Sequence, residues 1–158
     1  MPTPLSIGAT LPHFELGDAR GQTWTHRDLS SGEVIIYFYP QDETPGCTRQ
    51  ACALRDEHTR WTERGVRLFG VSPDDRDAHA RFTDNHDLPF TLLSDVDHLL
   101  CEAFGIWGTQ TWKGHTYEGV SRATFIFREG ALVHRLLDVQ VEGHWEQVWS
   151  AIDEGRAL

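Results

Sequence analysis

Cysteine is scarce in this sequence, which has three thiols in 158 residues. Such a small, odd number argues against a disulfide-stapled secreted scaffold, so we expect reduced thiols at rest and only transient disulfides. Long apolar runs are also missing, and the first residues contain no basic and apolar segments of the secretory type. These absences predict a soluble protein that neither crosses a membrane nor is exported, and we expect it in the cytoplasm.

Basic residues are few as well, because 14 Lys and Arg stand against 24 Asp and Glu, for a formal net charge of −10. The acidic residues are spread along the chain, which disfavours nucleic acid or an anionic membrane as a partner. Internal repeats, low-complexity tracts and breaks in composition are absent too. We therefore expect residues 1–158 to form one domain with a single sizeable core.

The apolar pattern that is present predicts alternating strands and helices after an irregular lead-in that ends near Ser31, with a short hairpin around residues 14–24. Strands are predicted at residues 34–39, 66–71, 92–93, 123–127 and 131–137, and helices at 47–63, 74–85, 95–104 and 143–154. Parallel βαβ units followed by an antiparallel hairpin and a closing helix indicate an α/β protein. The expected fold is thioredoxin-like, with a mixed central sheet and helices on both faces.

Cys47 lies where one of these helices is expected to begin. The strand 34–39 ends at Pro40, Thr44 occupies the N-cap, and Pro45 takes the first helical position, where its missing N–H costs nothing. The helix dipole and the unpaired amides of the first turn favour the thiolate of Cys47, which is the nucleophilic form of the side chain. The alternative is that Cys47 only packs as a small apolar residue, and these flanking residues make it less favoured.

Pro40, Thr44 and Cys47 have the spacing Pro-x-x-x-Thr-x-x-Cys, and with it the chain resembles the peroxiredoxins, which are thiol peroxidases that reduce hydroperoxides. Further segments are similar to the bacterioferritin-comigratory, or Q-type, subfamily. They are residues 38–40, 44–48, 51–52, 54–56, 92–95, 104–108 and 119–125. The resemblance runs from about residue 6 to the last helix, nearly the whole chain.

The resemblance implies that Cys47 is the peroxidatic cysteine, that Thr44 hydrogen-bonds the peroxide and that Pro40 shields the sulfur from water. It implies that Arg122 stabilises the thiolate, and a guanidinium fork can also hold both peroxide oxygens. A cysteine at the position of Cys52 is the resolving one in the subfamily. The implied cycle passes through a sulfenic acid and an intramolecular disulfide, needs no metal or organic cofactor, and uses a thioredoxin-like dithiol as reductant. Since the subfamily is often monomeric, we expect a monomer.

An ideal helix keeps Cys47 and Cys52 too far apart to form a disulfide. Five residues along an ideal helix put the Cα atoms of Cys47 and Cys52 roughly 8–9 Å apart, whereas a disulfide usually needs less than about 7 Å. We therefore predict an intact helix start in the reduced form and local unwinding, as far as Cys52, in the oxidised form. Cys101 is expected to pack on the apolar side of a short helix and to stay outside the cycle. Gln50 stands where many relatives carry Glu, which we expect to affect either the thiolate or the surface that meets the reductant.

Three other functions stay open at this point. A thiol-disulfide oxidoreductase on the same fold usually needs Cys-x-x-Cys, whereas four residues separate Cys47 from Cys52. A peroxide sensor would use the same Cys47 chemistry and pass its disulfide to a partner protein. A metal-binding module would draw on three Cys and nine His, although their spacings fit no zinc pattern. The aromatic connection 105–121 is expected to be a loop, which acts as a flap over the site, as a contact for the reductant or as a self-packed surface segment.

Overall fold

Seven strands form one mixed sheet in the computed structural model, which describes residues 3–156 and the side chains of residues 3–153. Their order is β2-β1-β5-β4-β3-β8-β9, and β6 and β7 form a separate two-stranded sheet. The strands are β1 (Glu15–Asp18), β2 (Thr23–Thr25), β3 (Glu33–Phe38), β4 (Val66–Ser72), β5 (Thr91–Ser94), β6 (Trp107–Trp112), β7 (His115–Val120), β8 (Ala123–Arg128) and β9 (Ala131–Leu137). The expected lead-in begins at residues 1–2, which lie outside the described residues.

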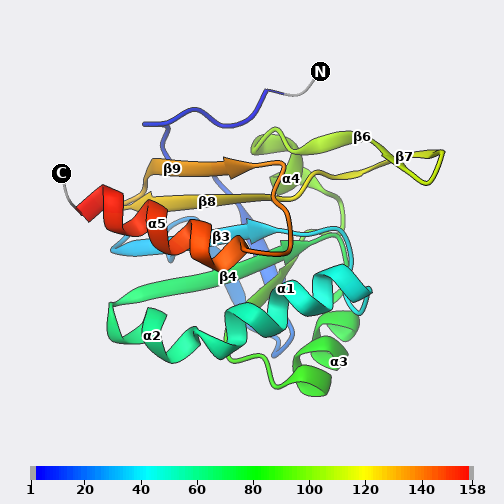
Figure 1. Cartoon of the computed structure of the whole chain (residues 1–158), viewed down its shortest axis with the longest axis horizontal. Helices are drawn as coiled ribbons and strands as arrows, with labels where there is room; N and C mark the ends of the chain where they lie inside the picture. The colour runs from blue at the N-terminus through cyan, green and yellow to red at the C-terminus, as the bar shows by residue number, and fades with distance from the viewer. Residues whose placement is uncertain (1–2, 157–158) are drawn as a thin grey trace.

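Helices lie on both faces of this sheet (Figure 1). They are α1 (Pro45–Asp56), α2 (His58–Glu63), α3 (Arg76–His86), α4 (Leu99–Ala103) and α5 (His144–Arg156). One core cluster joins side chains of α1, α2, α3 and α5 to one face, and a second joins α4 to the other. Because successive strand residues point to opposite faces, Ile35 and Tyr37 of β3 enter the first cluster, and Val34 and Ile36 enter the second.

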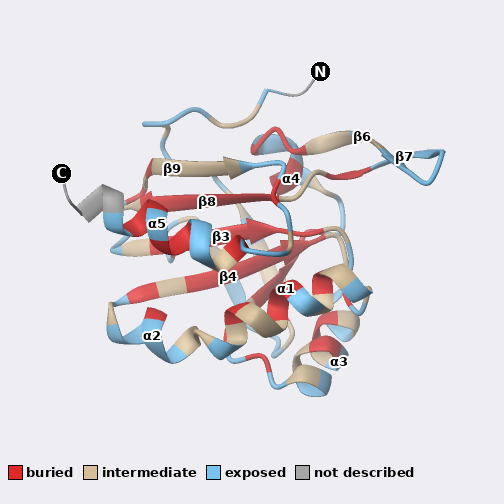
Figure 2. Ribbon diagram, in the orientation of Figure 1, coloured by how far each residue is buried: buried red, intermediate tan, exposed pale blue. Residues whose placement is uncertain are grey.

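The central strands are buried on both sides, as Figure 2 shows for β3, β4 and β8. This explains why they are near-continuous apolar runs in the sequence. The predicted α/β fold, thioredoxin-like with a mixed sheet and helices on both faces, is confirmed. Among the described residues, no helix combines the length and apolarity needed to span a bilayer.

Two predicted elements differ from the structure. The helix expected over residues 47–63 is divided at Glu57, which has φ −101° and ψ 1° and donates its N–H to Leu54 O, three residues back. The connection expected as a loop over residues 105–121 is instead the β6–β7 hairpin, which projects from the body of the molecule (Figure 1). Its two-residue turn is Lys113-Gly114, with φ of 49° and 81°, and this left-handed pair suits the strand twist of a tight hairpin.

Sheet topology brings distant parts of the chain to one end of β3. Because β8 runs antiparallel to β3, with Ala123 opposite Phe38, the start of β8 lies beside the end of β3. The helix α1 begins a few residues after that end, at Pro45. Residues that precede β8 therefore lie close to the first turn of α1.

Candidate active site

Cys47 is buried in the first turn of α1, with 1% of its surface exposed. Thr44 is the N-cap residue, with extended backbone (φ −73°, ψ 151°), and Pro45 follows it at the first helical position. The predicted helix start is therefore confirmed. The positive end of the helix dipole lies next to the sulfur, which is an arrangement that favours an anion.

Arg122 reaches this sulfur from the segment before β8. Its Nη2 donates to Cys47 Sγ at 3.2 Å, and its Nη1 donates to Gln50 Oε1 at 2.7 Å. A Cβ added at Gly46 would stand 3.0 Å from the same Nη2, so the glycine leaves room for the guanidinium. One planar fork thus joins the Cys47 sulfur to the buried amide of Gln50, which a lysine ammonium does not reproduce.

A chain of hydrogen bonds holds the guanidinium from behind. Gln50, 1% exposed, contacts His144 Nδ1 through its Nε2 at 3.3 Å, and His144 Nε2 contacts Thr124 Oγ1 at 2.7 Å. Since the Gln50 amide donates through Nε2, His144 Nδ1 must accept, and the ring is neutral with its proton on Nε2. Because Gln50 is buried, its side chain is not part of the surface that a reductant would meet. It supports the guanidinium of Arg122 from inside the protein.

Protonation of His144 is expected to weaken the fold. Burial, and then the charge of Arg122, lower the pKa of His144 to about 4, from an ordinary value near 6.5. Above about pH 6.5 the folded and unfolded states both hold the neutral ring. Between about pH 6.5 and 4 only the unfolded state gains the proton, so stability falls by about 3 kcal/mol as the pH falls. Denaturant unfolding of wild type and His144→Gln at pH 7 and 4 should show this loss in wild type alone. An equal loss in both proteins would contradict the assignment.

Thr44 differs from the expectation in its hydrogen bonding. Its hydroxyl does not cap the helix and donates instead to Gln41 O at 3.0 Å. The backbone N–H groups of Gly46 and Cys47 therefore donate to no capping side chain. They point toward the N-terminal end of α1, where the Cys47 sulfur lies. Pro40 follows the last backbone pairing of the strand, Tyr39 N to Val71 O at 3.1 Å, and so ends the ladder as expected.

A cleft of about 770 Å³ opens above these residues. Pro40, Thr44, Gly46 and Arg122 are part of its lining. The hairpin contributes an aromatic wall, formed by Trp107, Trp112 and Tyr117. The structure therefore places the β6–β7 segment at the mouth of the site, which favours the flap among the three expected roles for it.

All three cysteines are free thiols. Cys52 lies in α1 with Cys47, and the helix is continuous between them, as predicted for a reduced form. Cys101 lies in the core cluster on the opposite face of the sheet. Burial, and then the nearby Asp95, raise the pKa of the Cys101 thiol far above its ordinary range, so this side chain is a poor nucleophile.

Pro40, Thr44 and Arg122 line one cleft, and Cys47 is buried next to it, in contact with Arg122. Cys52 lies further along the same helix. Sequence reasoning missed His144, and it expected the aromatic connection 105–121 as a loop and not as a hairpin. The bond from Gln50 to His144 spans 94 residues, for which a single sequence has no local signal. The hairpin had one, since Lys113-Gly114 stands between two short segments that contain threonine and aromatic residues, which favour strands.

The chain is similar to known proteins of one family. Residues 7–135 match the model of the AhpC/TSA family. Among curated proteins, peroxiredoxin Bcp of Escherichia coli (strain K12) is 39% identical over 152 residues, which cover 96% of this chain and 97% of that protein. Peroxiredoxin Bcp of Bacillus subtilis (strain 168) is 40% identical over 141 residues, 89% and 90% of the two chains.

Solved structures give the same result. The Xanthomonas campestris bacterioferritin comigratory protein, described for its alkyl peroxide reduction activity, superposes with a TM-score of 0.86 at 31% identity, covering 96% of this chain and 97% of that one. A PrxQ variant from Xylella fastidiosa superposes with a TM-score of 0.90 at 27% identity, covering 98% and 99%.

Proposed function

Because the chain belongs to the AhpC/TSA family and is a thiol peroxidase of the peroxiredoxin Bcp or Q type, we propose that Cys47 is its peroxidatic nucleophile. The observation that carries this proposal is the 3.2 Å contact from Arg122 Nη2 to Cys47 Sγ at the start of α1. A guanidinium and a helix N-terminus both stabilise a thiolate, and the thiolate is the form that attacks peroxides.

In the first step the Cys47 thiolate attacks the outer oxygen of a hydroperoxide in line with the O–O bond. A sulfur–oxygen bond forms, the O–O bond breaks, and the leaving oxygen takes a proton to become water or an alcohol, while Cys47 becomes a sulfenic acid. Negative charge moves from sulfur to the leaving oxygen. Arg122, the first-turn amides and the Thr44 hydroxyl surround this path, which is preorganised electrostatic stabilisation, while Pro40 limits access of water.

In the second step Cys52 attacks the sulfenic sulfur. A disulfide forms, the sulfur–oxygen bond breaks, and the hydroxide leaves as water after taking the Cys52 proton. The continuous helix between the two cysteines keeps their Cα atoms roughly 8–9 Å apart, so α1 must unwind before the bond closes. A thioredoxin-like dithiol then reduces the disulfide by exchange. Because both cysteines lie in one helix, the cycle runs within a monomer, and we place it in the reducing cytoplasm.

The aromatic wall of the cleft supports organic hydroperoxides as substrates beside hydrogen peroxide. Trp107, Trp112 and Tyr117 can cover an alkyl or aryl group while the hydroperoxide end reaches the floor next to Arg122. The alkyl peroxide reduction described for the Xanthomonas campestris neighbour agrees with this substrate class.

Cys52→Ser is expected to separate the two steps. The first reaction of peroxide with Cys47 should keep its rate to within about threefold, because Cys52 does not take part in it. Continuous turnover with a thioredoxin-type reductant should fall more than about tenfold, because the sulfenic acid then has no internal thiol. Stopped-flow oxidation and a coupled reductant assay measure the two rates. Normal turnover of this variant would show that Cys52 is not the resolving residue.

A further inference from the structure

The loop that leads into α1, residues 40–44, is held mainly by side chains that reach across to β4 and α3. Asp42 is 7% exposed, and its backbone N–H donates to Asp74 Oδ2 at 2.9 Å. Ser72 Oγ donates to the same carboxylate oxygen at 2.6 Å. This loop contains Pro40 and Thr44, which line the cleft, so its position decides where both lie relative to the sulfur.

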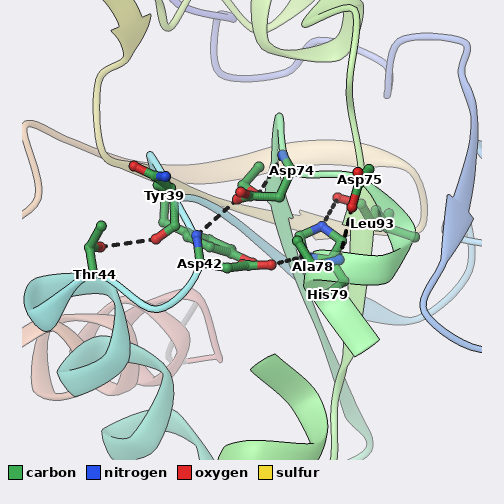
Figure 3. A network of polar contacts seen from close by, with 10 residues as sticks. Tyr39, Asp42, Thr44, Asp74, Asp75, Ala78, His79 and Leu93 are labelled. Carbon is green, nitrogen blue, oxygen red and sulfur yellow. Dashed lines mark hydrogen bonds and ion pairs between the residues drawn. The ribbon is translucent and has the colours of Figure 1, made fainter. Parts of the chain in front are cut away.

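The Asp42 carboxylate makes the central contact of this network (Figure 3). Tyr39 Oη donates to Asp42 Oδ1 at 2.6 Å, and His79 Nδ1 lies 2.6 Å from Asp42 Oδ2. His79 is fully buried in α3, and its Nε2 donates to Leu93 O at 3.0 Å. Burial raises the pKa of Tyr39, which keeps its hydroxyl protonated as the donor.

A second contact lies one residue further along. Glu43 has a left-handed backbone, with φ 65°. Its carboxylate accepts a bond of 2.7 Å from Asn85 Nδ2 and lies 2.7 Å from His86 Nε2, both in the last turn of α3. The loop is therefore tied to both ends of one helix that carries no residue of the reactive site.

The side chains of Asp42, Asp74 and His79 also bring their ligand atoms within 4.8 Å of one another. Each of them already has a protein partner, since both His79 nitrogens and both Asp42 oxygens are engaged. A cation would have to replace these bonds, so a hydrogen-bonded anchor is the better interpretation of the cluster.

We infer that Asp42 and His79 are positioning residues for the peroxidase reaction, which fix Pro40 and Thr44 over Cys47 from α3. The inference rests on the proposed role of Cys47. The anchor acts before Pro45, where α1 begins, so α1 can unwind for the disulfide while the substrate-binding loop keeps its place. Loss of the anchor then moves Thr44 and Pro40 but leaves Arg122 and the helix start, which stabilise the thiolate.

The test compares two reactions of the reduced protein. Reaction with cumene hydroperoxide needs the placed loop, whereas alkylation by iodoacetamide needs only an accessible thiolate. Asp42→Ala should lower the peroxide rate constant more than about tenfold and leave alkylation equal or faster. Asp42→Asn should restore most of the peroxide rate, because its amide can accept from Tyr39 Oη and place a nitrogen donor next to His79 Nδ1.

Asp75→Ala is the matched control, since the Asp75 side chain caps the same helix through Ala78 N at 2.8 Å and, within the described part of the chain, makes no hydrogen bond to residues 40–44. It should leave the ratio of the two rates unchanged. An unchanged ratio in Asp42→Ala, or an equal fall in Asp75→Ala, would overturn the inference.

If Asp42→Ala does not fold, Glu43→Ala tests the contact of the loop with the last turn of α3 and should lower the ratio about threefold. An unchanged ratio in that variant counts equally against the inference. Cys47→Ser separates the two proposals, because a variant that still consumes peroxide would refute the role of Cys47 whatever the loop does.

Discussion

Cys47→Ser is expected to lower peroxide turnover more than about a thousandfold, because a serine hydroxyl is not ionised at neutral pH and is a much weaker nucleophile than a thiolate. The substitution changes one atom of a buried side chain at the start of α1, so the fold should remain. Peroxide consumption in the presence of a thioredoxin-type reductant, together with a melting curve, measures both effects.

Cys101→Ala is the control for loss of a thiol. Cys101 is as buried as Cys47 but lies in the core cluster on the other face of the sheet. Its loss should cost some stability through the cavity it leaves, and activity should stay within about twofold. Peroxidase activity in Cys47→Ser above a trace, or a matching loss in Cys101→Ala, would count against Cys47 as the nucleophile.

Arg122→Ala is expected to slow the oxidation of Cys47 by a factor of about 100 to 1,000, the usual effect of removing one donor from a preorganised site. The residue contributes two bonds, to Cys47 Sγ and to Gln50 Oε1. Arg122→Lys keeps the charge but cannot make both bonds in one plane, so it should recover only part of the rate. Stopped-flow measurement of the second-order rate constant with peroxide gives these values directly.

Arg49→Ala tests whether charge alone matters at this cleft. Arg49 also lines the cleft, but its side chain is mostly exposed and pairs with Glu142 at 3.3 Å. An exposed ion pair contributes little, so the rate should change less than about threefold. Equal losses in Arg49→Ala and Arg122→Ala would point to general attraction of the substrate and not to the contact with sulfur.

Much of the fold could be predicted because its signals are local. The strands β3, β4 and β8 are buried on both faces and read as apolar runs, and the Thr44-Pro45 pair marks the start of α1. The break at Glu57 was missed because an apolar period continues through it to the buried Trp61. The hairpin was missed because its aromatic residues mostly face the cleft and solvent, and no core period results.

Some residues of the site could likewise be predicted from the local sequence, and others could not. Pro40, Thr44 and Cys47 lie within eight residues, so their grouping is visible in the sequence. Arg122 lies 75 residues from Cys47 and was found only through the family resemblance. The contact of Asp42 with His79 spans 37 residues, and it depends on how α3 packs beside the loop, which local patterns do not encode.

The most direct test of the account is to treat the reduced protein with one equivalent of hydroperoxide and to map its cysteines by mass spectrometry. The account predicts a single bridge between Cys47 and Cys52, with Cys101 still a thiol. Oxygen or a bridge on Cys101, or a Cys47 thiol that survives while peroxide is consumed, would contradict it.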